Sequence, residues 1–207
     1  MPDNANRLSK VPLSYSDIDI FVLAGGQGRR VRHLLNGMPK VLAVVGNKLM
    51  LECLLDWIYD IGGRHVVLGL GVGHEHVVKY FEEHPCSYLR IDLSIEKEPL
   101  GTAGAVRHAR HLLGSDPVLI VNGDTLIDVD MLTFFKHQQR FRTTMLVANG
   151  AGTSAGACLM NRETFDRLIA DEEISLEKFL SKEHLIRFRC QQFHDIGTPG
   201  GWRGPRE

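Results

Sequence analysis

The sequence has few cysteines, no long apolar run and almost no surplus charge. Its four cysteines, Cys53, Cys86, Cys158 and Cys190, form no C-x-x-C pair. This spacing argues against a disulfide framework or a structural zinc site and favours reduced thiols. No apolar run approaches the roughly 20 residues of a membrane helix, and residues 1–16 lack the apolar core of a signal peptide. We therefore expect a soluble, cytoplasmic protein that has no membrane partner.

The charge balance also excludes some partners. The formal net charge is −1, so no overall field attracts nucleic acid, and any anion must be bound by a local site. The length of 207 residues and the 43% hydrophobic content are typical of one globular domain. We predict a single domain over residues 1–207, with residues 1–16 as a flexible N-terminus.

Short apolar runs alternate with helical stripes along the chain. The patterns predict strands at 18–23, 65–70, 89–95, 118–121, 143–148, 155–160 and 188–193, and helices at 51–61, 74–84, 102–113, 131–139, 163–170 and 174–180. This alternation predicts an α/β fold, a three-layer sandwich around a mostly parallel sheet. Ligands bind such sheets beyond the carboxyl ends of the strands, where loop 24–30 and the segment 122–124 would both lie.

The loop after the first predicted strand is rich in glycine and arginine. It reads Leu23-Ala24-Gly25-Gly26-Gln27-Gly28-Arg29-Arg30, and Pro39-Lys40 follows. Glycines bring backbone N–H groups close to an anion, and basic side chains add charge. The alternative is a glycine turn with solvated basic residues. The loop lacks both the dinucleotide fingerprint and the Gly-Lys-Ser/Thr of a P-loop.

Four motifs together resemble the sugar-1-phosphate nucleotidyltransferases. They are the glycine loop with Pro39-Lys40, and the segments 96–105, 121–125 and 195–199. They occur in the family's order and span most of the chain, although the family usually has Thr in place of Arg29. The resemblance implies a Rossmann-like nucleotidyltransferase (glycosyltransferase-A-like) fold. It also implies transfer of a nucleoside monophosphate to a sugar 1-phosphate, with release of pyrophosphate.

The same resemblance implies the roles of individual residues. The catalytic residues would be Arg30, Lys40 and Asp124, and the metal ligands for Mg²⁺ would be Asp124 and Asp195. The nucleotide would be bound by Leu23, Ala24, Gly25, Gly26, Gly28, Glu96, Gly101, Thr102 and Asp124. Mg²⁺ prefers oxygen ligands and is usually held by one or two carboxylates together with phosphates. Taken singly, either aspartate could instead be a turn or cap residue.

Glu96 bears on the choice of base. Pyrimidine-using relatives tend to have Gln there, whereas a carboxylate only accepts hydrogen bonds and suits the adjacent N1–H and 2-amino donors of guanine. We therefore predict GTP; a solvated Glu96, or a thymidylyl- or uridylyltransferase, is the alternative. The short chain and the segment 174–180 are similar to the D-glycero-α-D-manno-heptose 1-phosphate guanylyltransferases, which favours a manno-configured heptose or hexose.

The chain departs from the family on the sugar side. Relatives insert a segment between Ala148 and Ala155 that carries a sugar-phosphate-binding Lys, and this chain has no such Lys. Either Lys182 or Arg187 replaces it, or turnover is impaired and the protein is a non-catalytic nucleotide-binding relative. An enzyme that attaches GMP to a molybdopterin is a further alternative, which the segments 96–105 and 195–199 argue against. A homo-oligomer is possible.

Overall fold

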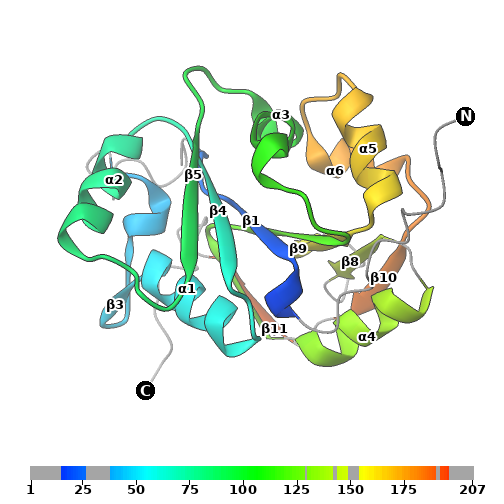
Figure 1. Ribbon diagram of the computed structural model, residues 1–207, viewed down its shortest axis with the longest axis horizontal. Helices are drawn as coiled ribbons and strands as arrows, with labels where there is room; N and C mark the ends of the chain where they lie inside the picture. The colour runs from blue at the N-terminus through cyan, green and yellow to red at the C-terminus, as the bar shows by residue number, and fades with distance from the viewer. Residues whose placement is uncertain are drawn as a thin grey trace, which may run out of the picture.

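The computed structural model describes residues 15–26, 38–128, 130–141, 144–148, 154–189 and 192–195. Its centre is a seven-stranded sheet with the order β10-β8-β9-β6-β1-β4-β5 (Figure 1). The strands are β1 (Asp19–Leu23), β4 (His65–Leu70), β5 (Arg90–Ile95), β6 (Val118–Asn122), β8 (Met145–Ala148), β9 (Ser154–Met160) and β10 (Ile186–Arg189). Among these seven, only β9 runs against its neighbours, so the predicted mostly parallel sheet is confirmed.

Helices cover both faces of the sheet, which gives the predicted three layers (Figure 1). On one face lie α1 (Met50–Asp60), α2 (His74–Glu83) and α4 (Met131–Phe141). On the other lie α3 (Gly101–His108), α5 (Arg162–Ala170) and α6 (Leu176–Ser181). Successive strand side chains point to opposite faces, so the apolar strands supply two cores. In β1, Ile20 and Val22 join the core under α1, whereas Phe21 joins the core under α3.

The remaining elements are short. The described residues form three 3₁₀ turns, η1 (Tyr15–Asp17), η2 (Lys40–Leu42) and η3 (Ala109–Leu112). One small sheet pairs β2 (Val44–Val45) with β3 (Lys48–Leu49). A second small sheet pairs β7 (Thr125–Asp128) with β11 (Gln192–Asp195). The predicted helix 102–113 is α3 followed by the tighter η3. The predicted strand 188–193 is wrong, because β10 ends at Arg189 in the large sheet while β11 pairs with β7.

The beginning of the described chain is held against the core. Residues 1–14 of the segment predicted to be flexible lie outside the described residues. Tyr15 is buried, and its hydroxyl donates to the carbonyl oxygen of Met131 at 2.7 Å. Burial raises the pKa of Tyr15 well above its usual range, so the hydroxyl stays a donor. Tyr15 is thus part of the core, although it lies within the segment predicted to be flexible.

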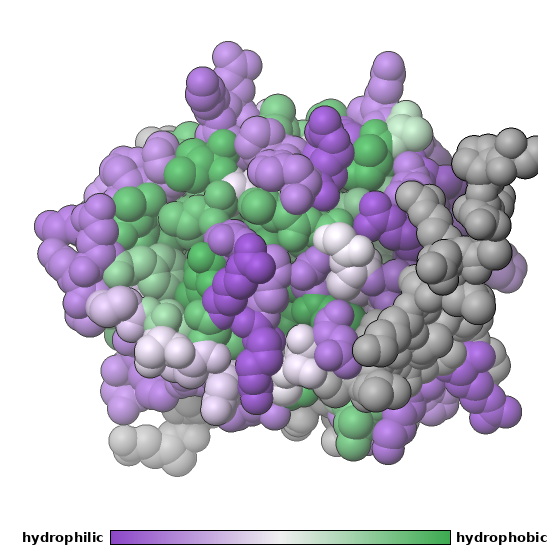
Figure 2. Space-filling model, in the orientation of Figure 1, coloured by the Kyte–Doolittle hydropathy of each residue, from purple (hydrophilic) through white to green (hydrophobic). Residues whose placement is uncertain are grey.

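The surface is polar apart from limited apolar areas. In Figure 2 hydrophilic side chains form most of the rim, and apolar side chains gather between α2 and α3. On the edge strand β5, Ile91, Leu93 and Ile95 are only partly buried. No helix in the described ranges is long and apolar enough to cross a membrane. The possible homo-oligomer stays a prediction.

Candidate functional site

The loops that follow β1 and β6 meet in a cleft at the carboxyl edge of the sheet. The two strands are parallel neighbours, so their ends lie side by side, as the sequence predicts. We call this cavity of about 470 Å³ the first cleft. Its lining residues are Leu23, Ala24, Gly25, Gly26, Lys40, Val41, Glu96, Pro99, Gly101, Thr102, Ala105, Asn122, Gly123 and Asp124.

The first cleft brings together the predicted site residues for which a side chain is described. They come from segments far apart in sequence: the glycine loop, η2, the end of β5, the start of α3 and the turn after β6. Two predicted residues, Gly28 and Arg30, lie outside the described residues. For Asp195 the structure describes the backbone alone.

Close backbone packing explains one glycine of the loop. A Cβ atom on Gly25 would lie 3.2 Å from the backbone nitrogen of Gly71, and one on Gly71 would lie 2.7 Å from the carbonyl oxygen of Gly25. The glycine loop therefore passes directly against the turn after β4. A Cβ atom on Gly26 would meet nothing within 4 Å. The backbone at Gly26 thus faces open space in the cleft, where a ligand can approach it.

Lys40 and Asp124 form the charged centre of the first cleft. The Lys40 ammonium donates to Asp124 Oδ2 at 2.6 Å, and the two side chains are 19% and 26% exposed. The other oxygen, Asp124 Oδ1, accepts from the Thr125 hydroxyl at 3.3 Å. Since both charged side chains are partly exposed, an incoming ligand can exchange partners with either one.

The small sheet places Asp195 beside this centre. β11 pairs with β7 in antiparallel register, and Asp195 lies opposite Thr125, the residue after Asp124. Two aspartates 71 positions apart therefore have neighbouring backbones. In the described ranges no group of three or more histidine, cysteine or acidic side chains gathers as a metal site would require.

Glu96 lies at the end of β5 and lines the first cleft. Its Oε2 accepts from the backbone N–H of Leu100 at 3.0 Å, which closes the turn that leads into α3. Its Oε1 lies near the glycine loop, 3.5 Å from where a Cβ atom on Gly25 would be. Each carboxylate oxygen accepts more than one hydrogen bond, so Glu96 keeps accepting capacity toward the cleft.

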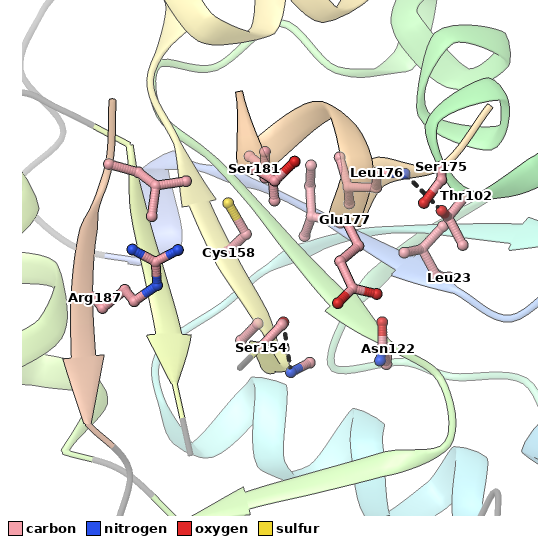
Figure 3. Close-up of a pocket in the computed structure, with 15 residues that line it drawn as sticks. Leu23, Thr102, Asn122, Ser154, Cys158, Ser175, Leu176, Glu177, Ser181 and Arg187 are labelled. Atoms are coloured by element: carbon pink, nitrogen blue, oxygen red, sulfur yellow. Dashed lines mark hydrogen bonds between the residues drawn. The ribbon is translucent and has the colours of Figure 1, made fainter. Parts of the chain in front are cut away.

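A second cleft of about 490 Å³ adjoins the first on the α6 side of the sheet (Figure 3). Leu23, Thr102 and Asn122 line both clefts. The other lining residues of the second cleft are Ile120, Ser154, Gly156, Ala157, Cys158, Ser175, Leu176, Glu177, Leu180, Ser181, Leu185 and Arg187. The shared residues make the clefts one continuous depression.

The second cleft supplies hydroxyl, amide and carboxylate groups. In Figure 3 the Glu177 carboxylate extends from α6 toward Asn122 and Ser154. Sequence reasoning missed Glu177, although it lies in the segment 174–180 that carries part of the resemblance. Burial raises the pKa of the Cys158 thiol to about 12, so this cysteine stays protonated and is no nucleophile.

The two basic residues proposed to replace the missing Lys differ in position. Arg187 lines the second cleft. Lys182 does not line it, and its ammonium lies 3.9 Å from a carboxylate oxygen of Glu173 on an exposed surface. The geometry therefore favours Arg187 over Lys182 as a residue that contacts a ligand there.

Comparison with known proteins shows what the chain is similar to. The model of the family described as "Nucleotidyl transferase" matches residues 20–156. A D-glycero-alpha-D-manno-heptose 1-phosphate guanylyltransferase of Aneurinibacillus thermoaerophilus is 28% identical over 90% of this chain and 96% of its own length. Mannose-1-phosphate guanyltransferase beta-B of Xenopus laevis is 32% identical over 69% of this chain, but this covers 41% of the Xenopus protein.

A solved structure has the same fold. The crystal structure of HddC from Yersinia pseudotuberculosis complexed with GMP-PN superposes with a TM-score of 0.74. The match covers 89% of this chain and 96% of that one, at 22% identity. The α/β architecture predicted from the sequence is thus confirmed.

Proposed function

Since the chain belongs to the nucleotidyl transferase family, we propose that it transfers GMP from GTP to a sugar 1-phosphate and releases pyrophosphate. The observation that carries the proposal is the pair of continuous clefts at the carboxyl edge of the sheet. The first has a glycine loop and a lysine suited to phosphates, and the second has groups suited to sugar hydroxyls. Similar proteins are named as guanylyltransferases of heptose and mannose 1-phosphates.

The proposed reaction is an in-line displacement at the α-phosphorus of GTP. An oxygen of the sugar phosphate forms the new P–O bond while the bond to the pyrophosphate oxygen breaks. The attacking oxygen is already anionic, so no general base is needed. Catalysis then depends on holding two anions together and stabilising the spread charge. We assign Gly25, Gly26 and Gly28 to the triphosphate, and Arg30 and Lys40 to the departing pyrophosphate.

The residues at the charged centre fit a magnesium ion. The Asp124 carboxylate lines the first cleft and already attracts a cation, the Lys40 ammonium. The register of β11 adds a second aspartate, Asp195, at the neighbouring backbone position. Mg²⁺ held by Asp124 and Asp195 would neutralise phosphate charge and orient the two substrates. Lys40 would then exchange its contact with Asp124 for the phosphates of the nucleotide.

We assign the base preference to Glu96. Its Oε1 is near the glycine loop, and both oxygens keep lone pairs for the N1–H and 2-amino donors of guanine. The hydrogen bond from Leu100 fixes the orientation of the carboxylate before the nucleotide binds. Uracil and thymine offer a single N–H between two acceptors, and a carboxylate repels those acceptors.

We assign the second cleft to the sugar. Asn122 and Ser154 each donate and accept, and Glu177 accepts, so together they can bind several hydroxyls of a manno-configured heptose or hexose. This cleft provides a sugar site without the inserted segment of the relatives. It therefore favours an active enzyme over a non-catalytic nucleotide-binding protein.

The test is pyrophosphate release in the presence of Mg²⁺. GTP, UTP, dTTP, ATP and CTP would each be paired with heptose, mannose and glucose 1-phosphates. We expect release with GTP and the manno-configured sugars. Release with UTP or dTTP alone would refute the assignment of Glu96 but keep the reaction. If nucleotides bound but no pair of substrates released pyrophosphate, the proposed function would be refuted.

A further inference from the structure

Arg187 lies at one end of a row of the sheet that has Asp92 of β5 at its other end and apolar residues in between. The strand registers align Phe21, Ile120, Cys158, Leu146 and Arg187 across β1, β6, β9, β8 and β10. Directly opposite residues share a face of the sheet, so Arg187 is on the face that α6 covers. The neighbouring Phe188 is on the other face, where its ring lies 5.5 Å from that of Phe134 in α4.

The guanidinium of Arg187 has no counterion within the described ranges. It forms no ion pair or hydrogen bond with a described residue, although Glu177 lines the same cleft. Figure 3 shows its head turned into the second cleft, on the side away from Leu23 and Thr102. Glu177 and Asn122 lie between. A guanidinium has five N–H donors and no acceptor, so it binds hydrogen-bond acceptors of a ligand, and sugar oxygens are such acceptors.

The sheet order indicates which end of the sugar reaches Arg187. The 1-phosphate must react in the first cleft, which joins the second at Thr102 and Asn122. β10 lies three strands from β6, or roughly 14 Å at the usual strand spacing. Arg187 therefore faces the ligand from the side remote from the reacting phosphate.

We propose that Arg187 is a specificity residue that binds the exocyclic oxygens of the sugar, on carbon 6 or beyond, and does not bind the 1-phosphate. The inference rests on the proposed function, because it assigns the sugar to the second cleft. The ring hydroxyls would bind Asn122, Ser154 and Glu177, and the exocyclic end would extend toward β10. The simpler role of Arg187 is a charge that protects an edge strand from aggregation.

Arg189 provides a matched control. It is one pleat further along β10, on the same face and also exposed, and it does not line the second cleft. Arg187→Ala and Arg189→Ala therefore make the same change in charge on one strand. Three sugar 1-phosphates test the contact: the manno-heptose, mannose, and lyxose, which is mannose without carbon 6.

The measurement is the KM for each sugar phosphate with GTP held saturating. We expect Arg187→Ala to raise the KM about 10-fold or more for the heptose and mannose compounds, since a charged donor is lost. The KM for lyxose 1-phosphate should stay within about 2-fold, and Arg189→Ala should change none of the three. Arg187→Lys should lower the KM part of the way back, because it restores the positive charge but not the planar set of paired guanidinium donors.

Other results would overturn the inference in distinct ways. If Arg187→Ala raised the KM equally for all three sugar phosphates, Arg187 would be assigned to the 1-phosphate. If the KM did not rise for any of them, the edge-strand role would be the one supported. If the wild type released no pyrophosphate, the proposed function would fail by itself. Calorimetric binding of the same three compounds would still test Arg187, and absence of binding by the wild type would overturn both.

Discussion

Replacing Gly101 by alanine should destabilise the protein and displace the segment before α6, because the added methyl group would meet the backbone of Ile174. Gly101 begins α3 with a φ of +73°, a region that disfavours residues with a Cβ atom. That Cβ atom would overlap the carbonyl oxygen of Ile174 and lie 3.1 Å from its carbonyl carbon. The segment before α6 must therefore move, and with it the hydrogen bond from Ala103 N–H to the Ile174 carbonyl oxygen at 3.0 Å.

The expected loss has two parts. The left-handed backbone costs roughly 1–2 kcal/mol for a residue other than glycine. Relief of the overlap with Ile174 costs about 1–3 kcal/mol more, because the obstacle is backbone and cannot rotate away. Gly46→Ala is the control, since Gly46 has a φ of +64° but a Cβ atom there would meet nothing within 4 Å. Gly46→Ala should therefore lose only the stability that the left-handed backbone conformation costs.

The assay is urea unfolding of both variants beside the wild type, together with the KM values for GTP and the sugar phosphate. We expect Gly101→Ala to lose at least about 1 kcal/mol more than Gly46→Ala, which in a chain of this size lowers the Tm by a further 2–4 °C or so. Its KM for the sugar phosphate should also rise, because α6 carries Glu177. Equal losses for the two variants, with unchanged KM values, would refute the reasoning.

Further predictions concern single side chains. Asp124→Asn should lower kcat by about 100-fold or more while the Kd for GTP changes little, as single-turnover kinetics and titration would show; near-normal turnover would remove Asp124 from the proposed metal site. Glu96→Gln should lower kcat/KM for GTP about 10-fold and raise that for UTP, and an unchanged ratio would mean that Glu96 reads no base. The hydrogen bond from His65, aided by Arg90, lowers the pKa of the Asp92 carboxyl below its usual value. A lowered pKa stabilises the fold above the unfolded value of about 3.9, so the stability gap between the wild type and Asp92→Asn should be full at pH 6 and shrink as the pH falls below about 4. A gap that stays constant from pH 6 to pH 3 would contradict this.

Local patterns predicted most of the fold. The strand β1 is a short, continuous apolar run followed by Gly25 and Gly26, and the helix α1 has apolar residues at the helical period of 3.6 and is followed by Gly62 and Gly63. The last strand failed for a physical reason. The residues from Arg189 to Gln192 include no turn former, so one pattern of alternation covers two strands that pair with different partners. Pairing is a long-range property that periodicity does not contain.

The clustering of residues in the first cleft was predictable because they lie in contiguous motifs. Gly25 and Gly26 adjoin one strand end and Asp124 adjoins another, and parallel pairing brings the two ends together. The sequence could not show that Lys40 pairs with Asp124, because that contact joins η2 to the turn after β6. It is a consequence of tertiary folding alone.

The second cleft was harder to predict, since its residues come from strands and a helix that no sequence motif joins. Glu177 and Arg187 are ten positions apart, and from the sequence each would be interpreted as a charged side chain exposed to solvent. They line one cleft only because β10 pairs with β8, while α6 is fixed by the Leu176 N–H, which donates to the Thr102 hydroxyl at 2.8 Å. Thr102 also lines the first cleft, so a nucleotide that contacts Thr102 acts on the residue that holds α6. The position of α6, and with it that of Glu177, should therefore depend on whether a nucleotide is bound. We expect GTP to bind before the sugar phosphate for this reason.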